Sequence, residues 1–253
     1  MNHSIHEKLM ALIALNIIPP FSDLFLTIRT MSRRIRGKSH KIIPCTIKKS
    51  THRALIPNQS CGLIELGKAD GNVRLSELAI LSLAAAATEA GTQIIEIGTF
   101  DGRTSLNLAN NAPPGCTIHT LDLPIGDQES FQKVTGGDQK YLPTVQSGAR
   151  IDSAPPHLKQ RITRLYGDST TFDWSPYHGQ AGLVFVDGAH TYEFTRKDTE
   201  TAFKLARNGA LIIWHDYGVW KGVNQALEEI CARDNLDMIW IRGTSLVLLR
   251  VKS

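Results

Sequence analysis

The stretch Ile94-Ile95-Glu96-Ile97-Gly98-Thr99-Phe100-Asp101-Gly102-Arg103-Thr104-Ser105-Leu106-Asn107-Leu108-Ala109 has the pattern of a strand, a glycine turn and a helix. Its isoleucines suit a strand that is buried on both faces, and its leucines give the helix an apolar side to cover that strand. Gly98 and Gly102 permit the backbone angles of a sharp turn and let a ligand lie directly against the main chain. Free amide groups would then face the ligand. The stretch therefore predicts a binding crevice where the strand ends.

The acidic residue ahead of the glycines narrows the kind of ligand. A dinucleotide site requires G-x-G-x-x-G with an acidic residue on the next strand, whereas this chain has E-x-G-x-x-x-G from Glu96 to Gly102. A carboxylate beside the ligand is unfavourable for a pyrophosphate and favourable for an ammonium or sulfonium group. S-Adenosylmethionine carries both of these cations. From the glycines alone, a tight strand-to-helix turn without a ligand stays open as the alternative.

Composition indicates one folded domain with a short appendage. The chain has 253 residues, of which 42% are hydrophobic and 21% are charged, and this is enough for one sizeable core. Its four cysteines are far apart and show no C-x-x-C spacing, which argues against a zinc site and against a disulfide framework. We therefore expect reduced thiols and a cytoplasmic protein.

The positive charge is concentrated at the N-terminus. Residues 1–53 hold 10 Lys/Arg against 2 Asp/Glu, a net charge of +8, and the rest of the chain holds 18 against 22, a net charge of −4. The basic character therefore belongs to an N-terminal arm. With a negative body, nucleic acid is not an expected partner.

The N-terminal arm contains an apolar run that is too short to cross a bilayer. The run stops at Pro19-Pro20 and falls short of the roughly 20 residues that a span requires. A second apolar stretch, residues 21–28, leads into several arginines, and this combination suits peripheral contact of residues 1–53 with an anionic membrane. The alternative that we favour is a helical arm packed on the body or on a second subunit of a homo-oligomer.

Domain organisation follows from the same pattern. The sequence from about residue 38 to residue 59 is basic and polar without clear periodicity, which is typical of a linker. We therefore expect residues 1–59 to form a basic, partly apolar arm and linker, and residues 60–253 to form the folded domain.

Two further strands end in carboxylates that suit a nucleoside. The run from Cys116 to Asp122 predicts a second strand, and an acid at its end can accept hydrogen bonds from both ribose hydroxyls. Asp168 and Ser169 follow a short strand, where Asp168 could accept from an adenine amino group. Each site has an alternative without a ligand, because Asp122 could cap the next turn and the Asp168-Ser169 pair could cap a helix.

Polar side chains also follow the next two predicted strands. A buried strand after Gly182 leads to Asp187 and His190, and the next strand leads directly to His215 and Asp216. Because the carboxyl ends of neighbouring parallel strands face the same crevice, these four side chains should meet. Two histidines and two carboxylates at successive strand ends indicate chemistry rather than core packing.

The remaining elements complete an α/β fold. A helix should run from about residue 76 towards Gly91, another should close at Gly209, and the polar stretch 126–160 is long enough for a lid or substrate loop. After a C-terminal helix, two apolar runs, 238–241 and 246–249, predict a hairpin. We therefore predict a Rossmann-like, doubly wound, seven-stranded and mostly parallel sheet with a C-terminal antiparallel hairpin.

Five motifs together resemble those of the class I S-adenosylmethionine-dependent methyltransferases. In order they are E-I-G-T-F-D-G-R-T-S-L-N-L-A, T-L-D-L-P, L-Y-G-D-S, F-V-D-G-A-H-T-Y and W-H-D-Y. Within that family the chain is most similar to the branch that contains sugar and macrolide O-methyltransferases and the cephalosporin hydroxylase-like proteins. The likeness runs from about residue 63 to residue 251 and leaves the N-terminal arm outside it. It implies methylation of a hydroxyl on a small-molecule or glycan acceptor.

The resemblance also implies roles for individual residues. The residues implied to bind S-adenosylmethionine are Glu96, Gly98, Thr99, Gly102, Thr104, Asp122, Leu123, Asp168, Ser169 and Asp187. Those implied to act in catalysis are Asp187, His190, His215 and Asp216. In metal-dependent relatives an acid after the fourth strand and two polar residues after the fifth hold magnesium, which implies Asp187, His215 and Asp216 as ligands of Mg²⁺ or another divalent cation. Histidine is a less typical Mg²⁺ ligand than a carboxylate, so His215, like His190, could instead be a base.

Two other functions stay open on the sequence. A nicotinamide-dependent oxidoreductase could use a similar sheet, although Glu96 and the missing G-x-G-x-x-G motif argue against it. A non-catalytic S-adenosylmethionine-binding or scaffold protein could use the basic arm to dock on a membrane or a partner. Ultraviolet absorbance of reduced nicotinamide would identify the first, and cofactor binding without methyl transfer would identify the second.

Overall fold

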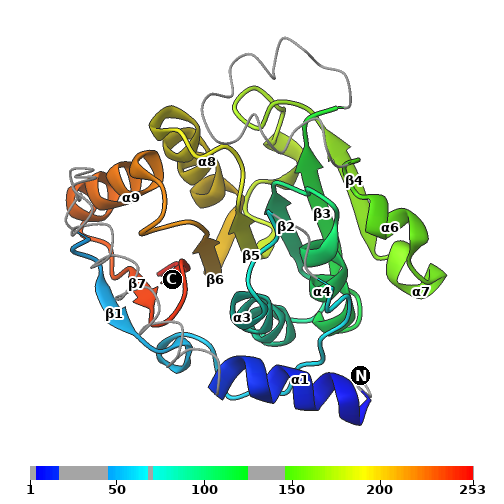
Figure 1. Ribbon diagram of the computed structural model, residues 1–253. Coiled ribbons are helices and arrows are strands. Elements are labelled where there is room, and N and C mark those ends of the chain that lie inside the picture. The colour runs from blue at the N-terminus through cyan, green and yellow to red at the C-terminus, as the bar shows by residue number, and fades with distance from the viewer. Residues whose placement is uncertain (1–3, 17–44, 68–70, 125–145, 253) are drawn as a thin grey trace, which may run out of the picture.

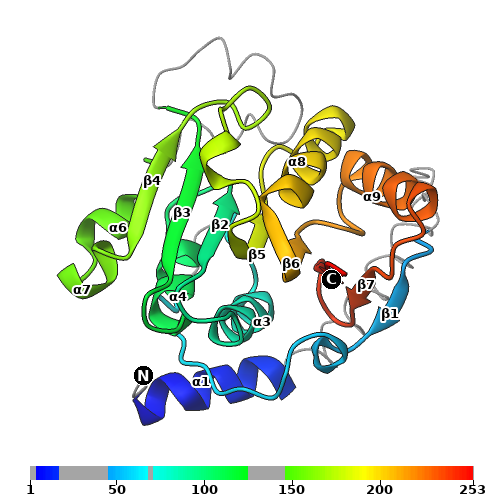
Figure 2. The same ribbon diagram turned by 180° about the vertical axis from the view of Figure 1, so that it is seen from behind.

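A mixed sheet lies at the centre of the protein (Figures 1 and 2). The computed structural model describes residues 4–16, 45–67, 71–124 and 146–252. Within these residues the sheet has eight strands in the order β1-β7-β8-β6-β5-β2-β3-β4, and β8 runs antiparallel to both of its neighbours. The strands are β1 (Lys48–Ser50), β2 (Gln93–Ile97), β3 (Thr117–Asp122), β4 (Ile162–Tyr166), β5 (Ala181–Val186), β6 (Ala206–Trp214), β7 (Ile239–Ile241) and β8 (Val247–Arg250).

Helices cover both faces of the sheet (Figure 1). On one face lie α3 (Leu75–Ala86) and α4 (Arg103–Asn111), with α1 (Ile5–Asn16) packed along α3; on the other lie α8 (Tyr192–Leu205) and α9 (Lys221–Arg233). The short helices α6 (Ala149–Ser153) and α7 (Pro156–Lys159) pack against α4, and two 3-10 turns span His52–Ala54 and Ser175–Tyr177. Alternate residues of β2 enter the two apolar cores, Ile94 on the α3 side and Ile95 on the α8 side.

The predicted α/β architecture with its C-terminal hairpin is confirmed, but the predicted number of strands is wrong. The eighth strand is β1, which pairs in parallel with β7 at the edge of the sheet. Beside it, the Glu228 carboxylate on α9 accepts a hydrogen bond of 2.6 Å from the backbone N–H of Thr46, and the Lys49 ammonium lies 4.0 Å above the Trp240 ring. A three-residue strand is too short to show periodicity, so the sequence indicated only a linker there.

The N-terminal helix α1 also contributes to the core, through its buried residues Ala11 and Ala14. The arginine-rich part of the expected arm falls in residues 17–44, outside the described residues, so the membrane contact stays a prediction. No helix in the described ranges is long and apolar enough to cross a membrane.

The helix expected to close at Gly209 ends earlier. α8 stops at Leu205, and β6 begins at once with Ala206, which pairs with Ala181 of β5. Gly209 lies inside this strand with φ +76°, and its N–H donates to the carbonyl of Val251. Most of the predicted lid lies in residues 125–145, outside the described ranges, and its last part forms α6 and α7.

Candidate active site

The glycine turn joins the ends of three strands. The N–H of Gly98 donates to Leu121 at the end of β3, and the N–H of Asp187 after β5 donates to Ile97 of β2. Gly98 has φ +102°, and a Cβ there would lie 2.1 Å from the carbonyl oxygen of Asp187. Gly102 has φ +88° and precedes the first residue of α4. Only glycine allows both the positive φ and the contact at position 98.

Glu96 places a buried carboxylate under this turn. Its Oε2 accepts hydrogen bonds from the hydroxyls of Ser105 and Thr120, and Thr120 in turn lies 2.6 Å from the Thr99 hydroxyl. Its Oε1 is buried and has no hydrogen-bond partner among the described residues. Burial raises the pKa of Glu96 to about 8, against the opposing effect of the two hydroxyls. A buried acceptor without a donor is suited to a cationic ligand group.

Asp122 combines a structural contact with room for a ligand. Its carboxylate accepts from the backbone N–H groups of Phe100, at 3.0 Å, and Leu123, at 2.9 Å. It therefore supports the glycine turn, in agreement with the turn-capping alternative. An ionised carboxylate has about four acceptor positions, so ribose hydroxyls can still be accommodated. Burial raises the pKa of Asp122 above its usual value.

The other predicted cofactor residues lie nearby with less distinctive contacts. Asp168 Oδ1 accepts from the N–H and hydroxyl of Thr170, so it caps a turn after β4, where the alternative without a ligand expected a helix. Ser169 uses its carbonyl to accept from Trp174. Thr104 stands in the first turn of α4, where its neighbour Ser105, which the sequence analysis did not single out, contacts Glu96.

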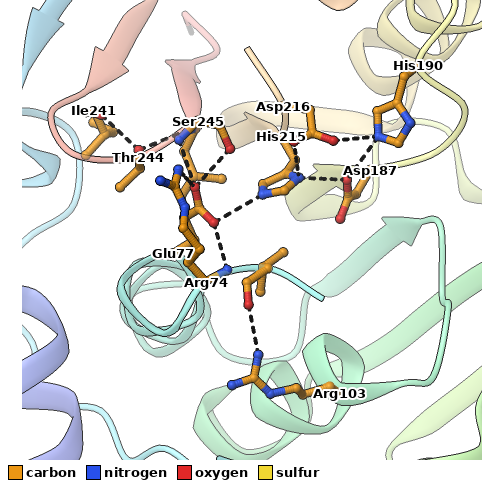
Figure 3. Close-up of polar contacts among 12 residues, drawn as sticks. Arg74, Glu77, Arg103, Asp187, His190, His215, Asp216, Ile241, Thr244 and Ser245 are labelled. Atoms are coloured by element: carbon orange, nitrogen blue, oxygen red, sulfur yellow. Dashed lines mark hydrogen bonds and ion pairs between the residues drawn. The ribbon is translucent and has the colours of Figure 1, made fainter. Parts of the chain in front are cut away.

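The four predicted side chains after β5 and β6 do meet (Figure 3). His190 Nε2 lies 2.7 Å from Asp216 Oδ2 and 3.9 Å from Asp187 Oδ1. His215 Nδ1 lies 3.0 Å from Asp187 Oδ1 and 3.3 Å from Asp216 Oδ1. The His190 ring is stacked on Trp220 with centroids 5.2 Å apart. The two acids therefore lie between two histidines.

Electrostatics hold this cluster in its charged form. Burial opposes a charge on His215, but three surrounding carboxylates outweigh it and raise the pKa of His215 well above its usual value. Burial likewise opposes charge on Asp187, yet the cationic His215 and hydrogen bonds from both histidines lower the pKa of Asp187. The pKa of Asp216 is lowered for the same reasons. Asp216 also adopts φ +61°, the kind of backbone strain found at functional sites.

The donor atoms that converge differ from the predicted metal set. Asp187, His190 and Asp216 offer ligand atoms that all lie within 4.8 Å of one another. His215, the third predicted ligand, instead reaches Glu77, with Nε2 3.2 Å from Oε2. The two carboxylates and the imidazole of Asp187, His190 and Asp216 are side-chain groups that bind divalent cations.

The sequence did not indicate that Glu77 contacts His215 or that Arg103 supports the loop before α3. Glu77, near the start of α3, is 1% exposed, and it accepts from the Arg74 N–H and the Ser245 N–H, both at 2.8 Å. Arg103 is also buried, and its guanidinium donates to the carbonyl of Val73 at 2.9 Å, so it fixes the loop before α3. A glutamate at a helix start is usually a cap, and no local pattern distinguishes one that also reaches a histidine 138 positions later.

Residues 95–217, which include the glycine turn and the acid–histidine cluster, match the family of methyltransferase domains. This chain carries a methyltransferase domain. The match confirms the resemblance to class I S-adenosylmethionine-dependent methyltransferases, and with it the implied cofactor. It leaves no support for the nicotinamide-dependent alternative. No curated protein sequence matches the chain.

Solved structures agree with the fold of this methyltransferase domain. The O-methyltransferase TomG from Streptomyces achromogenes, in complex with S-adenosylmethionine, is 19% identical and has a TM-score of 0.50 over 75% of this chain and 93% of its own. An O-methyltransferase from Bacillus cereus is also 19% identical, with a TM-score of 0.50 over 72% and 84%. The O-methyltransferase NovP is 14% identical, with a TM-score of 0.51 over 92% and 100%. At these identities the likeness establishes the Rossmann-like fold.

Proposed function

We propose that this methyltransferase transfers a methyl group from S-adenosylmethionine to a hydroxyl oxygen of a small molecule or a sugar. The observation that carries the proposal is the cluster of Asp187, His190 and Asp216 beside the glycine turn. An alcohol keeps its proton at neutral pH. Methyl transfer to oxygen therefore requires a group that takes this proton or lowers the pKa of the hydroxyl. The similar proteins TomG and NovP, described as O-methyltransferases, support this choice of acceptor atom.

The methyl donor would lie across the ends of β2, β3 and β4. The unpartnered Oε1 of Glu96 would bind the ammonium group of its methionine part, because a buried carboxylate oxygen needs a donor. Asp122 would accept the ribose hydroxyls, and Asp168 with Ser169 would lie towards the adenine. Asp187 belongs to the cluster, and its backbone also contacts Gly98 of the glycine turn, so donor and acceptor would meet there.

The transfer itself requires an aligned oxygen and a route for one proton. The acceptor oxygen forms a bond to the methyl carbon while the carbon–sulfur bond breaks, and the sulfonium becomes a neutral thioether. The hydroxyl proton passes to a base, for which the imidazole of His190 is the group beside both acids. Trp220 holds that ring by stacking on it.

A divalent cation gives the same three residues a second way to act. Asp187, His190 and Asp216 would hold the cation, which would supply a Lewis acid that lowers the pKa of the acceptor hydroxyl. The mixed oxygen and nitrogen donor set fits Mn²⁺ or Zn²⁺ better than Mg²⁺, which prefers oxygen ligands.

Methyl transfer to a panel of acceptors tests the function. The protein is incubated with labelled S-adenosylmethionine and with catechols, glycosides and nucleotide sugars, each paired with an amine analogue, in the presence of Mg²⁺ or Mn²⁺. We expect the mass of one methyl group on hydroxyl acceptors and none with the Asp187→Asn variant. Methylation of the amines alone would contradict the proposed acceptor atom. Cofactor binding without any transfer would favour the scaffold alternative.

A further inference from the structure

His215 is held by acids on both sides of its ring (Figure 3). Its Nε2 lies 3.2 Å from Glu77, and its Nδ1 lies 3.0 Å from Asp187 and 3.3 Å from Asp216. The contact at Nε2 is a hydrogen bond between the ring and Oε2 of Glu77. Nδ1, on the other side of the ring, lies within ion-pair distance of both acids.

Glu77 is the residue that fixes this arrangement. Its Oε1 accepts from the N–H of Ser245 at 2.8 Å and from the Ser245 hydroxyl at 2.9 Å, and the Arg74 guanidinium also contacts it. Its Oε2 accepts from the Arg74 N–H and faces His215. A carboxylate held by so many donors cannot turn away, so it orients the ring from the side opposite the acid pair.

We propose that Glu77 is a positioning residue that acts through His215, holding the ring so that its Nδ1 lies beside Asp187 and Asp216. The inference rests on the proposed function for the role of that acid pair. The histidine of the W-H-D-Y motif thereby connects Glu77 on α3 to the two acids.

Substitutions of His215 separate the two sides of its ring. Asparagine keeps an N–H donor near the place of Nδ1, whereas glutamine keeps one near the place of Nε2. We expect His215→Asn to retain more of kcat than His215→Gln, because only the first preserves the contact with the acids. His190→Gln should lose about 10²–10⁴ in rate. A loss of that size in both His215 variants, with His190→Gln near wild type, would make His215 the base and overturn the proposal.

A double-mutant cycle tests Glu77 itself. Glu77→Gln should lower kcat by about 10- to 100-fold, through loss of a charge-assisted hydrogen bond, and leave KM for S-adenosylmethionine unchanged. In the His215→Asn background the contact with Glu77 is already gone, so Glu77→Gln should cost no further kcat. Additive losses would mean that Glu77 serves only as a helix cap. Ser245→Ala, which removes one donor to the other oxygen of Glu77 and keeps the backbone N–H, should lower kcat by less than Glu77→Gln.

A spectroscopic measurement makes the result independent of the acceptor. In ¹⁵N-histidine-labelled protein, the Nε2 proton of His215 should be protected from exchange by its hydrogen bond to Glu77, and Glu77→Gln should remove that protection while leaving the His190 signals unchanged. Unchanged His215 signals in Glu77→Gln would overturn the positioning role. If the signals change as expected but no hydroxyl is methylated, the proposed acceptor fails and the positioning of His215 stands.

Discussion

Gly98 and Asp187 lie backbone against backbone, so closely that a Cβ on Gly98 would stand 2.1 Å from the Asp187 carbonyl oxygen. The contact joins the turn that would cradle the methyl donor to the strand end that carries the acid–histidine cluster. It connects two of the sequence motifs that are 89 residues apart. The position of Asp187 therefore depends on a glycine that contacts it through the backbone alone.

Gly98→Ala should disrupt both halves of the site. The added Cβ must displace Asp187 and also adopt φ +102°, so we expect a loss of about 2 kcal/mol or more in the free energy of unfolding, together with loss of cofactor binding. Gly91→Ala is the matched control, because Gly91 also has positive φ, at +78°, but no atom lies within 4 Å of its Cβ position. Equal destabilisation in both variants, measured by urea unfolding, would show that steric contact with Asp187 does not matter.

Glu96 should make the cofactor-free protein less stable as pH rises. Its folded pKa of about 8 lies above its usual value of 4.5, so its contribution is fully present below about pH 4.5 and is lost as pH rises through about 8. Glu96→Gln mimics the protonated form and should flatten that part of the stability profile. Melting temperatures between about pH 5 and pH 9 measure the effect.

Cofactor binding should release a proton from the same residue. An ammonium group beside Glu96 favours the ionised carboxylate, so near neutral pH S-adenosylmethionine should bind with net proton release. Calorimetry in buffers of different ionisation enthalpy counts the protons. Proton release that persists in Glu96→Gln would assign it to another group.

Removal of residues 1–53 should destabilise the domain. The deletion removes β1, the buried side chain of Ile47 and the packing of α1 on α3, for a loss of about 2 kcal/mol or more. Glu228→Ala should reproduce part of the loss, because Glu228 holds the residues before β1, whereas Glu229→Ala, an exposed neighbour, should not. An unchanged melting temperature in the deletion would mean that residues 1–53 add little to the stability of the domain.

The motifs predicted the central strands of the sheet because each motif is an apolar, buried strand followed directly by polar residues. The continuous burial of β2 and the acids at or just after the ends of β3, β5 and β6 are local features, and parallel pairing brings such endings to one edge. β1 was missed because its three residues, of which two are exposed, pair with a strand almost two hundred positions away. Pairing of that range leaves no trace in local periodicity.

The sequence predicted which residues form the acid–histidine cluster but not which of their atoms are in contact. The meeting of two histidines and two acids follows from strand order, but which nitrogen faces which acid depends on the rotamers that packing selects. Glu77 decides this for His215, and it comes from α3, which precedes the glycine motif in the sequence, whereas His215 follows it. Its contact with His215 is tertiary, whereas its sequence context is that of an ordinary helix cap.

A divalent cation held by Asp187, His190 and Asp216 is the mechanism that we expect for proton removal, because three donor atoms within 4.8 Å of one another, two of them anionic, form a ready cation site. Chelation should then abolish methyl transfer, and Mn²⁺ should restore it at lower concentration than Mg²⁺. His190→Asp should keep substantial activity with Mg²⁺, since a carboxylate is a good ligand for that ion, and Asp187→Asn should be more damaging than His190→Asp.

With His190 as a base instead, the results would reverse. Chelators would have no effect, activity would fall at low pH as the imidazole becomes protonated, and both His190→Gln and His190→Asp would cost about 10²–10⁴ in rate. The His190→Asp variant therefore separates the mechanisms, because aspartate can replace histidine as a ligand but is too weak a base near neutral pH. Measurements of kcat with and without chelator, over a range of pH, decide between them. Full activity of His190→Gln in chelator would contradict both and would leave the alignment of oxygen and methyl carbon as the source of catalysis.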